Sequence, residues 1–247
     1  MNSHILVEQI DKHFDKTTTK EIHALDSISF SVKKGEFFCI VGPNGAGKTT
    51  LLNIVAGFEK PTNGIVRING NRVIGPNGRY VTMFQEHALF PWRTVLSNVE
   101  YGLEIKGIGK AEREEIAREY IELVGLRGFE NSHPSRLSGG MKQRVQLART
   151  LAVEPEIIFM DEPFGALDPI TKRTLQQELE KIWKHEKKTI IFVTHDIDSA
   201  IRLGDRIAIM SPQPGKIKEI IDVGIERPRD RFDPKFAEIE KRILENI

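Results

Sequence analysis

Residues 42–50, Gly-Pro-Asn-Gly-Ala-Gly-Lys-Thr-Thr, have the types and the spacing of a loop that binds phosphate groups. They fit the pattern G-x-x-x-x-G-K-[ST] at each fixed position. The glycines let the backbone N–H groups turn inward, and a helix that begins there adds partial positive charge where phosphate oxygens would lie. We expect Lys48 to reach the β- and γ-phosphates and the Thr49 hydroxyl to take one Mg²⁺ position. The expected nucleotide-binding residues are Gly42, Pro43, Asn44, Gly45, Ala46, Gly47, Lys48, Thr49 and Thr50.

The segments on either side of this loop support the nucleotide-site interpretation. Residues 37–41 are a short apolar run typical of a buried strand, and residues 51–56 suit a helix. Strand, loop and helix is the context that the phosphate-loop pattern requires. It disfavours the alternative, a glycine-rich turn that ends in Lys-Thr by chance.

Two further buried-strand patterns end in side chains that could do chemistry. Residues 157–160 lead into Asp161 and Glu162, and residues 189–194 lead into His195. Neighbouring parallel strands bring their carboxyl ends to one edge of a sheet. We therefore expect Asp161 to be the Mg²⁺ carboxylate, Glu162 to polarise the attacking water, and His195 to bond the γ-phosphate. The alternatives are a strand-ending turn and a structural histidine.

Three weaker signals could belong to the same site. Gln85 follows the strand pattern of residues 80–84, although a lone glutamine there is more often a loop residue. Phe14 could stack on a purine ring or pack beneath a loop. Ser138, Gly139 and Gly140 open a helix and form a second potential anion site, although for that string alone a plain serine cap with glycines in the turn is the better interpretation.

Composition narrows the possible classes. The 247 residues, 39% of them hydrophobic, suffice for one large α/β domain or two modest ones. With 36 basic and 35 acidic residues the formal charge is +1, which gives no support to nucleic-acid binding. Cys39 lies in an apolar run, which argues against a disulfide framework. We see neither a secretory signal nor an apolar run of about 20 residues, so we expect membrane contact only through a partner.

The remaining pattern is mixed α/β. Residues 4–10 and 25–32 predict an antiparallel hairpin around a polar loop at 15–20, and residues 91–130 show helical spacing. Leu89, Phe90 and Trp92 could close this helical insert onto the core or anchor a partner helix. The other expected elements are helices at 141–152, 171–187 and 233–247, the last with Phe236, Ile239 and Leu244 on its apolar face, and strands at 206–210 and 216–223.

Five strings in one order, GPNGAGKTT, Gln85, LSGGM at 137–141, IIFMDEP at 157–163 and THD at 194–196, resemble the ATPase subunit of an ATP-binding cassette (ABC) transporter. The resemblance covers nearly the whole chain. It implies an α/β fold: a P-loop NTPase core with a mostly parallel sheet, an N-terminal antiparallel β subdomain and an α-helical insert at about 91–153. It also implies one domain over 1–247, without an added regulatory domain. Residues 84–104, 161–169 and 211–217 look like the importers for nitrate, aliphatic sulfonates and taurine.

The resemblance also implies roles and partners. In this family two subunits pack head to tail, so Ser138, Gly139 and Gly140 of one subunit face the phosphate loop of the other. ATP and Mg²⁺ are the implied cofactors. The residues implied to act in cis are Lys48 on phosphate, Thr49, Gln85 and Asp161 at Mg²⁺, and His195 at the γ-phosphate. Glu162 is implied to be the general base, and Phe14 to stack on adenine. Asp168 is implied to lie in the loop between subunits.

The implied partners are a second copy of the chain and integral membrane permease subunits, with an extracytoplasmic solute-binding protein acting indirectly. The implied location is the cytoplasmic face of the cell membrane. Met141 stands where the family more often has glutamine, while the serine and glycines before it remain.

Two other classes compete with this interpretation. Soluble cassette ATPases of translation or DNA repair usually carry two cassettes or a long coiled-coil insertion, and the sequence shows neither. A P-loop kinase or GTPase is disfavoured by the LSGG string and by the lack of an Asn-Lys-x-Asp motif. The sequence does not indicate which solute would be carried.

Overall fold

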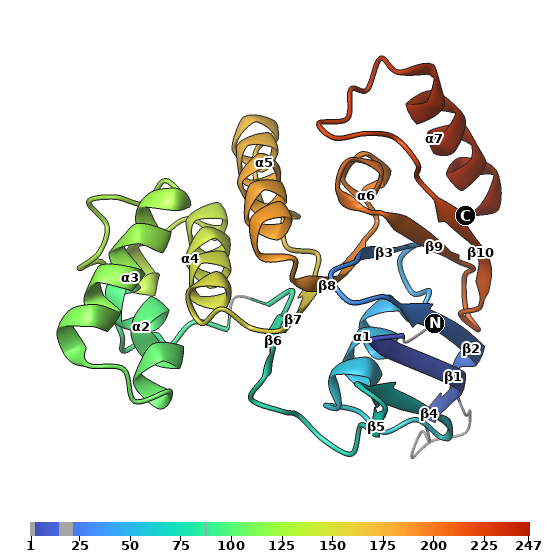
Figure 1. The fold of residues 1–247 in the computed structure, drawn as a ribbon, viewed down its shortest axis with the longest axis horizontal. Helices are drawn as coiled ribbons and strands as arrows, with labels where there is room; N and C mark the ends of the chain where they lie inside the picture. The colour runs from blue at the N-terminus through green and yellow to red at the C-terminus, as the bar shows by residue number, and fades with distance from the viewer. Residues whose placement is uncertain (1–2, 15–21, 87) are drawn as a thin grey trace.

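The computed structural model describes residues 3–14, 22–86 and 88–247 (Figure 1). The polar loop predicted at 15–20 lies outside the described residues. Within them the strands form two sheets. The antiparallel sheet has the order β2 (Ile22–Val32), β1 (Ile5–Phe14), β4 (Asn63–Ile68) and β5 (Asn71–Arg72). The larger sheet has the order β10 (Ile217–Asp222), β9 (Arg206–Met210), β3 (Phe37–Val41), β8 (Thr189–Thr194), β7 (Ile157–Asp161) and β6 (Tyr80–Met83).

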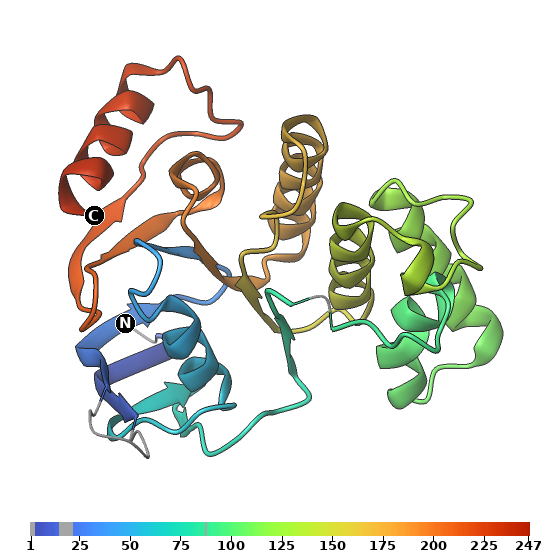
Figure 2. The same cartoon turned by 180° about the vertical axis from the view of Figure 1, so that it is seen from behind.

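The described part of the chain contains helices that cover the larger sheet and others that stand apart from it (Figures 1 and 2). They are α1 (Lys48–Ala56), α2 (Val95–Ile105), α3 (Lys110–Leu123), α4 (Gly139–Ala152), α5 (Pro169–Glu186), α6 (Ile197–Leu203) and α7 (Pro234–Asn246), with a short 3-10 turn at Pro134–Arg136. Helices α2, α3 and α4 form a separate lobe at one side of the molecule, which Figures 1 and 2 show from opposite sides. No helix in the described ranges is both long enough and apolar enough to cross a membrane.

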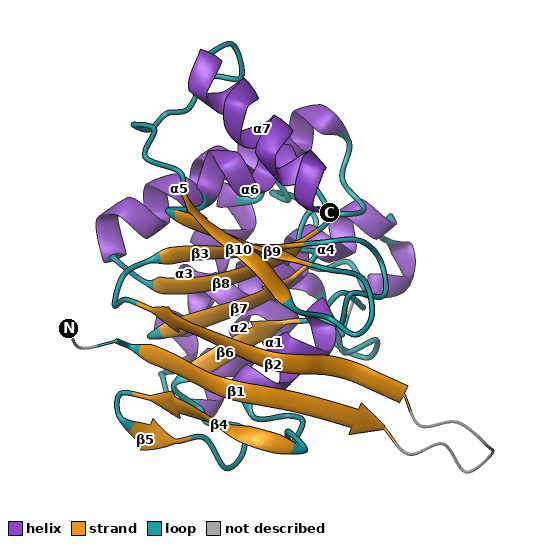
Figure 3. Cartoon of the chain, turned by 90° about the vertical axis from the view of Figure 1, so that its right-hand side faces the viewer, coloured by secondary structure: helices purple, strands orange, loops and turns teal. Residues whose placement is uncertain are grey.

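The larger sheet is parallel except at β10, which pairs antiparallel with β9. Its central strands β3, β7 and β8 are buried on both faces, as expected when both faces are covered. Phe38 and Ile40 of β3 join a core with α1 and the antiparallel sheet. Phe37 and Cys39 point the other way into a core with the remaining helices. Figure 3 shows α5, α6 and α7 on one side of the sheet and the antiparallel sheet on the other.

The predicted antiparallel hairpin is confirmed, and its strands are longer than expected. Alternation continues through β2, where Ile28, Phe30 and Val32 are buried. Ser27 interrupts the register with a positive φ of 50°, and its N–H donates to Asp11 Oδ1 at 2.9 Å. The longer strands bring Phe14 opposite Ile22.

One predicted helix face is corrected by the structure. In α7 the buried residues are Phe236, Ile239 and Ile243, whereas the predicted Leu244 is 61% exposed. Ile243 completes the i, i+3, i+7 spacing that faces the sheet, and Leu244 is turned about 100° away from it. In α3 the fully buried residues are Ala117 and Ile121, and Ile116, Tyr120 and Leu123 are partly buried and pack against the same core.

The central strand β8 generates a stability prediction. Phe192 is fully buried between Phe37 and Phe164, with ring centroids 5.8 Å and 5.7 Å away. Phe192→Ala should lower the free energy of unfolding by about 3–5 kcal/mol, because it removes a ring and leaves a cavity. Phe232→Ala is the control, since Phe232 is 92% exposed and its loss should change stability by less than about 0.5 kcal/mol. Urea unfolding of both variants measures the difference, and equal effects would contradict the packing.

Candidate nucleotide site

The phosphate loop, residues 42–47, joins the end of β3 to the start of α1. Gly47 caps α1 with a φ of 82°, and a Cβ there would lie 2.7 Å from Leu25 Cδ2, so glycine is required. The buried Lys48 ammonium donates to Gly42 O at 2.8 Å and to Pro43 O at 3.0 Å. Burial lowers the pKa of Lys48, and the nearby carboxylates of Glu162 and Asp161 oppose that shift.

A cavity of about 550 Å³ opens above this loop. It brings together most of the residues predicted for the site, namely Phe14, Asn44, Gly45, Gly47, Lys48, Thr49, Thr50, Gln85, Asp161, Glu162 and His195. Among the remaining loop residues, Gly42 and Pro43 hold the Lys48 ammonium through their carbonyls, and Ala46 is fully buried. Segments far apart in the sequence therefore share one concave site, the usual setting for ligand binding.

Asp161 ends β7 and is 3% exposed. Burial raises its pKa, and a hydrogen bond with Thr49 acts in the opposite direction. Asp161 Oδ1 is buried without a hydrogen-bond partner among the described residues. An unsatisfied buried carboxylate oxygen beside a threonine hydroxyl is a donor set that suits Mg²⁺, which prefers oxygen ligands. The residues present therefore fit the predicted ion.

Glu162 has a left-handed backbone, with a φ of 48°, directly after the strand. Its Oε1 accepts from His195 N and from His195 Nδ1, both at 2.8 Å, and its Oε2 accepts from the Thr194 hydroxyl at 3.0 Å. The bond to a carboxylate assigns the proton to Nδ1 and leaves Nε2 as the other ring nitrogen. Backbone strain at such a position occurs chiefly at functional sites.

The order of the strands places Lys48 and Asp161 at one edge of the sheet, but not on adjacent strands. The strand before the Lys48 loop is β3, and β8 lies between it and β7, which ends in Asp161. The three strands are in register at their carboxyl ends, with Val41 paired to Thr194 and Asp161 paired to Val193. The two charged groups consequently flank the end of β8, where His195 follows.

Four predicted site residues lie elsewhere in a single chain. Ser138 caps α4 by accepting from Met141 N at 3.2 Å, and neither it nor Gly139 or Gly140 is among the described residues that line the cavity. Asp168 caps α5, accepting from Thr171 N at 3.0 Å and Ile170 N at 3.2 Å. Hydrogen bonding to Thr171 lowers the pKa of Asp168. The roles predicted for these four residues thus require something beyond one chain.

The cavity wall also contains residues that the sequence analysis missed. They are Ile22, Ala24 and Gln213. Gln213 comes from the turn between β9 and β10, and this turn bonds to β2 through Gly215 N and Ala24 O at 2.9 Å. A Cβ on Gly215 would lie 2.1 Å from Ala46 O, so the turn packs directly on the phosphate loop. The Pro-Gly turn was visible in the sequence, but no spacing linked it to residues 42–47.

Comparisons with known proteins agree with this geometry. Residues 25–165 match the family described as ABC transporter. An uncharacterized ABC transporter ATP-binding protein of Methanocaldococcus jannaschii is 51% identical over 244 residues, 99% of this chain and 91% of that protein. The aliphatic sulfonates import ATP-binding protein SsuB of Bacillus cereus is 43% identical over 243 residues, 98% of this chain and 95% of that protein.

Two solved structures share the fold. One is a dimeric post-hydrolysis state of an ATP-binding cassette bound to ADP and Pi, with a TM-score of 0.82 and 34% identity. The other is a dimeric bacterial ABC transporter cassette, with a TM-score of 0.83 and 35% identity. Each covers 90% of this chain and 100% of its own.

The buried carboxylate generates a prediction about pH. The folded pKa of Asp161 lies above 3.8, so the folded protein binds this proton more tightly than the unfolded chain does, and stability falls as pH rises through that window. Without nucleotide, Asp161→Asn should therefore be more stable than the unmodified protein at neutral pH, because it removes a charge that burial disfavours. The advantage should shrink as the pH falls towards 3.8.

Urea unfolding at several pH values measures this advantage. Asp230→Asn is a suitable control, because Asp230 is exposed and its substitution should change stability little at any pH. An Asp161→Asn protein that is less stable than the unmodified one at neutral pH would contradict the burial argument.

Proposed function

Because the chain belongs to the ABC transporter family, we propose that it is the ATP-hydrolysing subunit of an importer for a small solute. The chain is an ATPase that binds ATP with Mg²⁺. The observation that carries the assignment of its reactive groups is the shared cavity. Lys48, Asp161 and Glu162 line it together, although Lys48 begins α1 and the two carboxylates lie at the end of β7, far along the chain.

We assign the roles in cis from this geometry. The Lys48 ammonium, which donates to loop carbonyls in the single chain, would instead donate to phosphate oxygens of bound ATP. Phe14 lines the same cavity, where a purine ring could stack on it. Thr49 and Asp161 would hold Mg²⁺, with Gln85 beside them on the cavity wall. Bound Mg²⁺ would offset the negative charge of the phosphates.

Glu162 is the proposed general base, and its hydrogen bonds indicate which oxygen acts. Oε1 accepts two bonds from His195, which uses both of its lone pairs. Oε2 accepts one bond, from Thr194, and so keeps a lone pair that can take a proton from water. A hydrogen bond from His195 Nε2 to a phosphate oxygen requires a proton on Nε2 as well as the one on Nδ1 that Glu162 accepts.

A complete site is proposed to need a second copy of the chain. Ser138, Gly139 and Gly140 open the 14-residue helix α4, whose first N–H groups favour an anion. In the head-to-tail dimer these residues would meet the γ-phosphate bound by the partner, and Asp168 would lie between the copies. The dimeric solved relatives support this arrangement. ATP binding would close the dimer, and hydrolysis with product release would reopen it.

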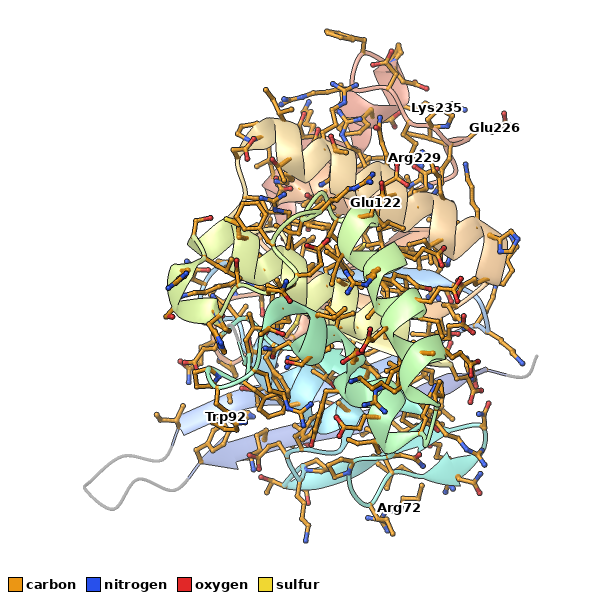
Figure 4. The ribbon with its side chains drawn as sticks, turned by 90° about the vertical axis from the view of Figure 1, so that its left-hand side faces the viewer. Arg72, Trp92, Glu122, Glu226, Arg229 and Lys235 are labelled. Atoms are coloured by element: carbon orange, nitrogen blue, oxygen red, sulfur yellow. The ribbon has the colours of Figure 1, made fainter. Side chains whose placement is uncertain are left out.

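The membrane partner is proposed to dock on the lobe of α2, α3 and α4. Phe90 packs against Tyr101 and Trp92, with centroids 4.6 Å and 5.6 Å apart, while Trp92 itself is 73% exposed. Trp92 stands at the outline of the molecule in Figure 4. The sequence left two roles open for this cluster, and the geometry supports both: Phe90 closes the lobe, and Trp92 is free to anchor a partner helix.

We further propose that the permease subunits place the chain at the cytoplasmic face of the membrane, with an extracytoplasmic solute-binding protein acting through them. The similarity to the sulfonate import protein favours a small oxyanionic solute such as a sulfonate, with nitrate and taurine in the same class. Solute-stimulated ATPase activity of the reconstituted complex tests this choice.

The first test concerns the base. Glu162→Gln should bind ATP and accumulate as a dimer, while its turnover falls about 100-fold or more, because the proton acceptor is lost but the nucleotide contacts remain. Single-turnover hydrolysis and light scattering measure the two effects. Glu226→Gln is the control, because Glu226 is exposed on the C-terminal segment (Figure 4). Unchanged turnover of Glu162→Gln would contradict the role of Glu162 as general base.

The second test concerns the partner surface. Trp92→Ala should reduce recovery of the chain with a multispanning protein from detergent-solubilised membranes by about tenfold or more. This is the effect expected when an aromatic side chain that is exposed in the free chain becomes buried in the interface with a partner. Ile74→Ala is the matched control, since Ile74 is 86% exposed but follows β5 of the antiparallel sheet and lies outside the lobe of α2, α3 and α4. Equal recovery of both variants would exclude Trp92 as the anchor.

A further inference from the structure

Helix α4 carries two buried glutamines that lie three residues apart. Gln143 is 4% exposed and Gln146 is 1% exposed. Residues three apart on a helix share one face, so both side chains leave α4 in the same direction. Among the described residues neither amide bonds to another side chain, and each reaches backbone atoms of a loop that belongs to the candidate site.

Gln143 spans the loop that contains Glu162. Its Nε2 donates to Glu162 O at 3.0 Å, and its Oε1 accepts from Ala166 N at 3.0 Å. The loop is also close to α4, because a Cβ on Gly140 would lie 3.2 Å from Ala166 O. Glu162 has the positive φ described above, and a strained backbone persists only where surrounding contacts hold it. Gln143 supplies such a contact at the residue proposed to be the base.

Gln146 holds the segment that contains Gln85. Its Nε2 donates to Phe84 O at 2.8 Å and to Glu86 O at 3.4 Å, the carbonyls on either side of Gln85. The side chain of Gln85 is left to line the cavity. Gln146 Oε1 has no partner among the described residues, so its amide is not fully satisfied by the fold. The hydrogen bonds of the Gln146 side chain therefore serve only to hold the segment around Gln85.

We propose that Gln143 and Gln146 are positioning residues through which α4 sets the places of Glu162 and Gln85. The proposal rests on the proposed function of those two residues. Helix α4 packs against α2 and α3 and begins at Gly139, with Ser138 as its N-cap. A displacement of the helical lobe, or a contact at the start of α4, is thereby passed to the base through Gln143 and to the Mg²⁺ side of the cavity through Gln146.

Methionine substitutions test the proposal, because methionine keeps the approximate length of glutamine and removes its hydrogen bonds. Gln143→Met should lower kcat roughly tenfold or more, because small misplacements of reacting groups are costly, and leave the KM for ATP within about twofold. Gln146→Met should raise the Mg²⁺ concentration for half-maximal activity roughly tenfold, because a residue beside the ion loses its support.

Gln176→Met is the matched control. Gln176 is also 4% exposed, but it joins α5 to α6 by donating to Ser199 Oγ at 2.6 Å and touches neither loop. It should change thermal stability as much as the other two variants while leaving kcat and the Mg²⁺ dependence unchanged. Gln143→Glu serves if Gln143→Met does not fold, because it keeps the acceptor for Ala166 N and loses the donor to Glu162 O.

The outcomes separate this inference from the proposed function. If Gln143→Met and Gln146→Met both behave like Gln176→Met, the positioning role is overturned even though Glu162→Gln is inactive. If only one of them does so, the role of that glutamine is overturned. If Glu162→Gln itself retains normal turnover, the proposed base is wrong, and the inference about Gln143 falls with it.

Discussion

The pairing of β7 with β8 ends where Glu162 N–H donates to Val193 O at 2.9 Å. That bond fixes the level at which the chain leaves the sheet, because Asp161 lies opposite Val193 and Val41 of β3 lies opposite Thr194. Three adjacent strands thus release a phosphate loop, a histidine and a pair of carboxylates at one height. A shift of one residue in any strand would turn its reactive side chain to the other face of the sheet.

Burial of both faces makes that register hard to change. The residues of β3, β7 and β8 are buried on each side, with alternate side chains in two separate cores. The same burial acts on the charged groups at the strand ends, where it raises the pKa of Asp161 and lowers that of Lys48. Both shifts disfavour the charged forms that phosphate and Mg²⁺ binding need. Burial of these charged side chains therefore lowers the stability of the protein without ligands, and bound phosphate and Mg²⁺ would offset that loss.

Much of this site could be predicted from the sequence because its signals are local. The phosphate loop has a fixed spacing, and apolar runs that end in Asp-Glu or His identify strand ends directly. Strand order is not local, so the place of β8 between β3 and β7 could not be predicted. The seven residues of α6 give too few turns for a helical period to show.

Other features escaped prediction for different reasons. Leu244 and Ile243 are adjacent and equally apolar, so only packing decides which faces the core. Gln143 and Gln146 look like ordinary polar residues on a helix surface. Their burial became visible only when the loops they bond to were in place. Buried polar residues of this kind are specified by a tertiary partner, and periodicity assigns them to the wrong face.

The position of α4 gives the two halves of the proposed dimer a physical connection. Its exposed start would touch the nucleotide of the partner, whereas its buried glutamines hold Glu162 and the segment around Gln85 in its own chain. A short helix moves as a rigid unit, so a contact at Ser138 that shifts α4 would also displace the two loops that are hydrogen-bonded to it. With two-fold symmetry the same link runs in each direction. Occupancy of one site would then bias the geometry of the other, through hydrogen bonds already present in the single chain.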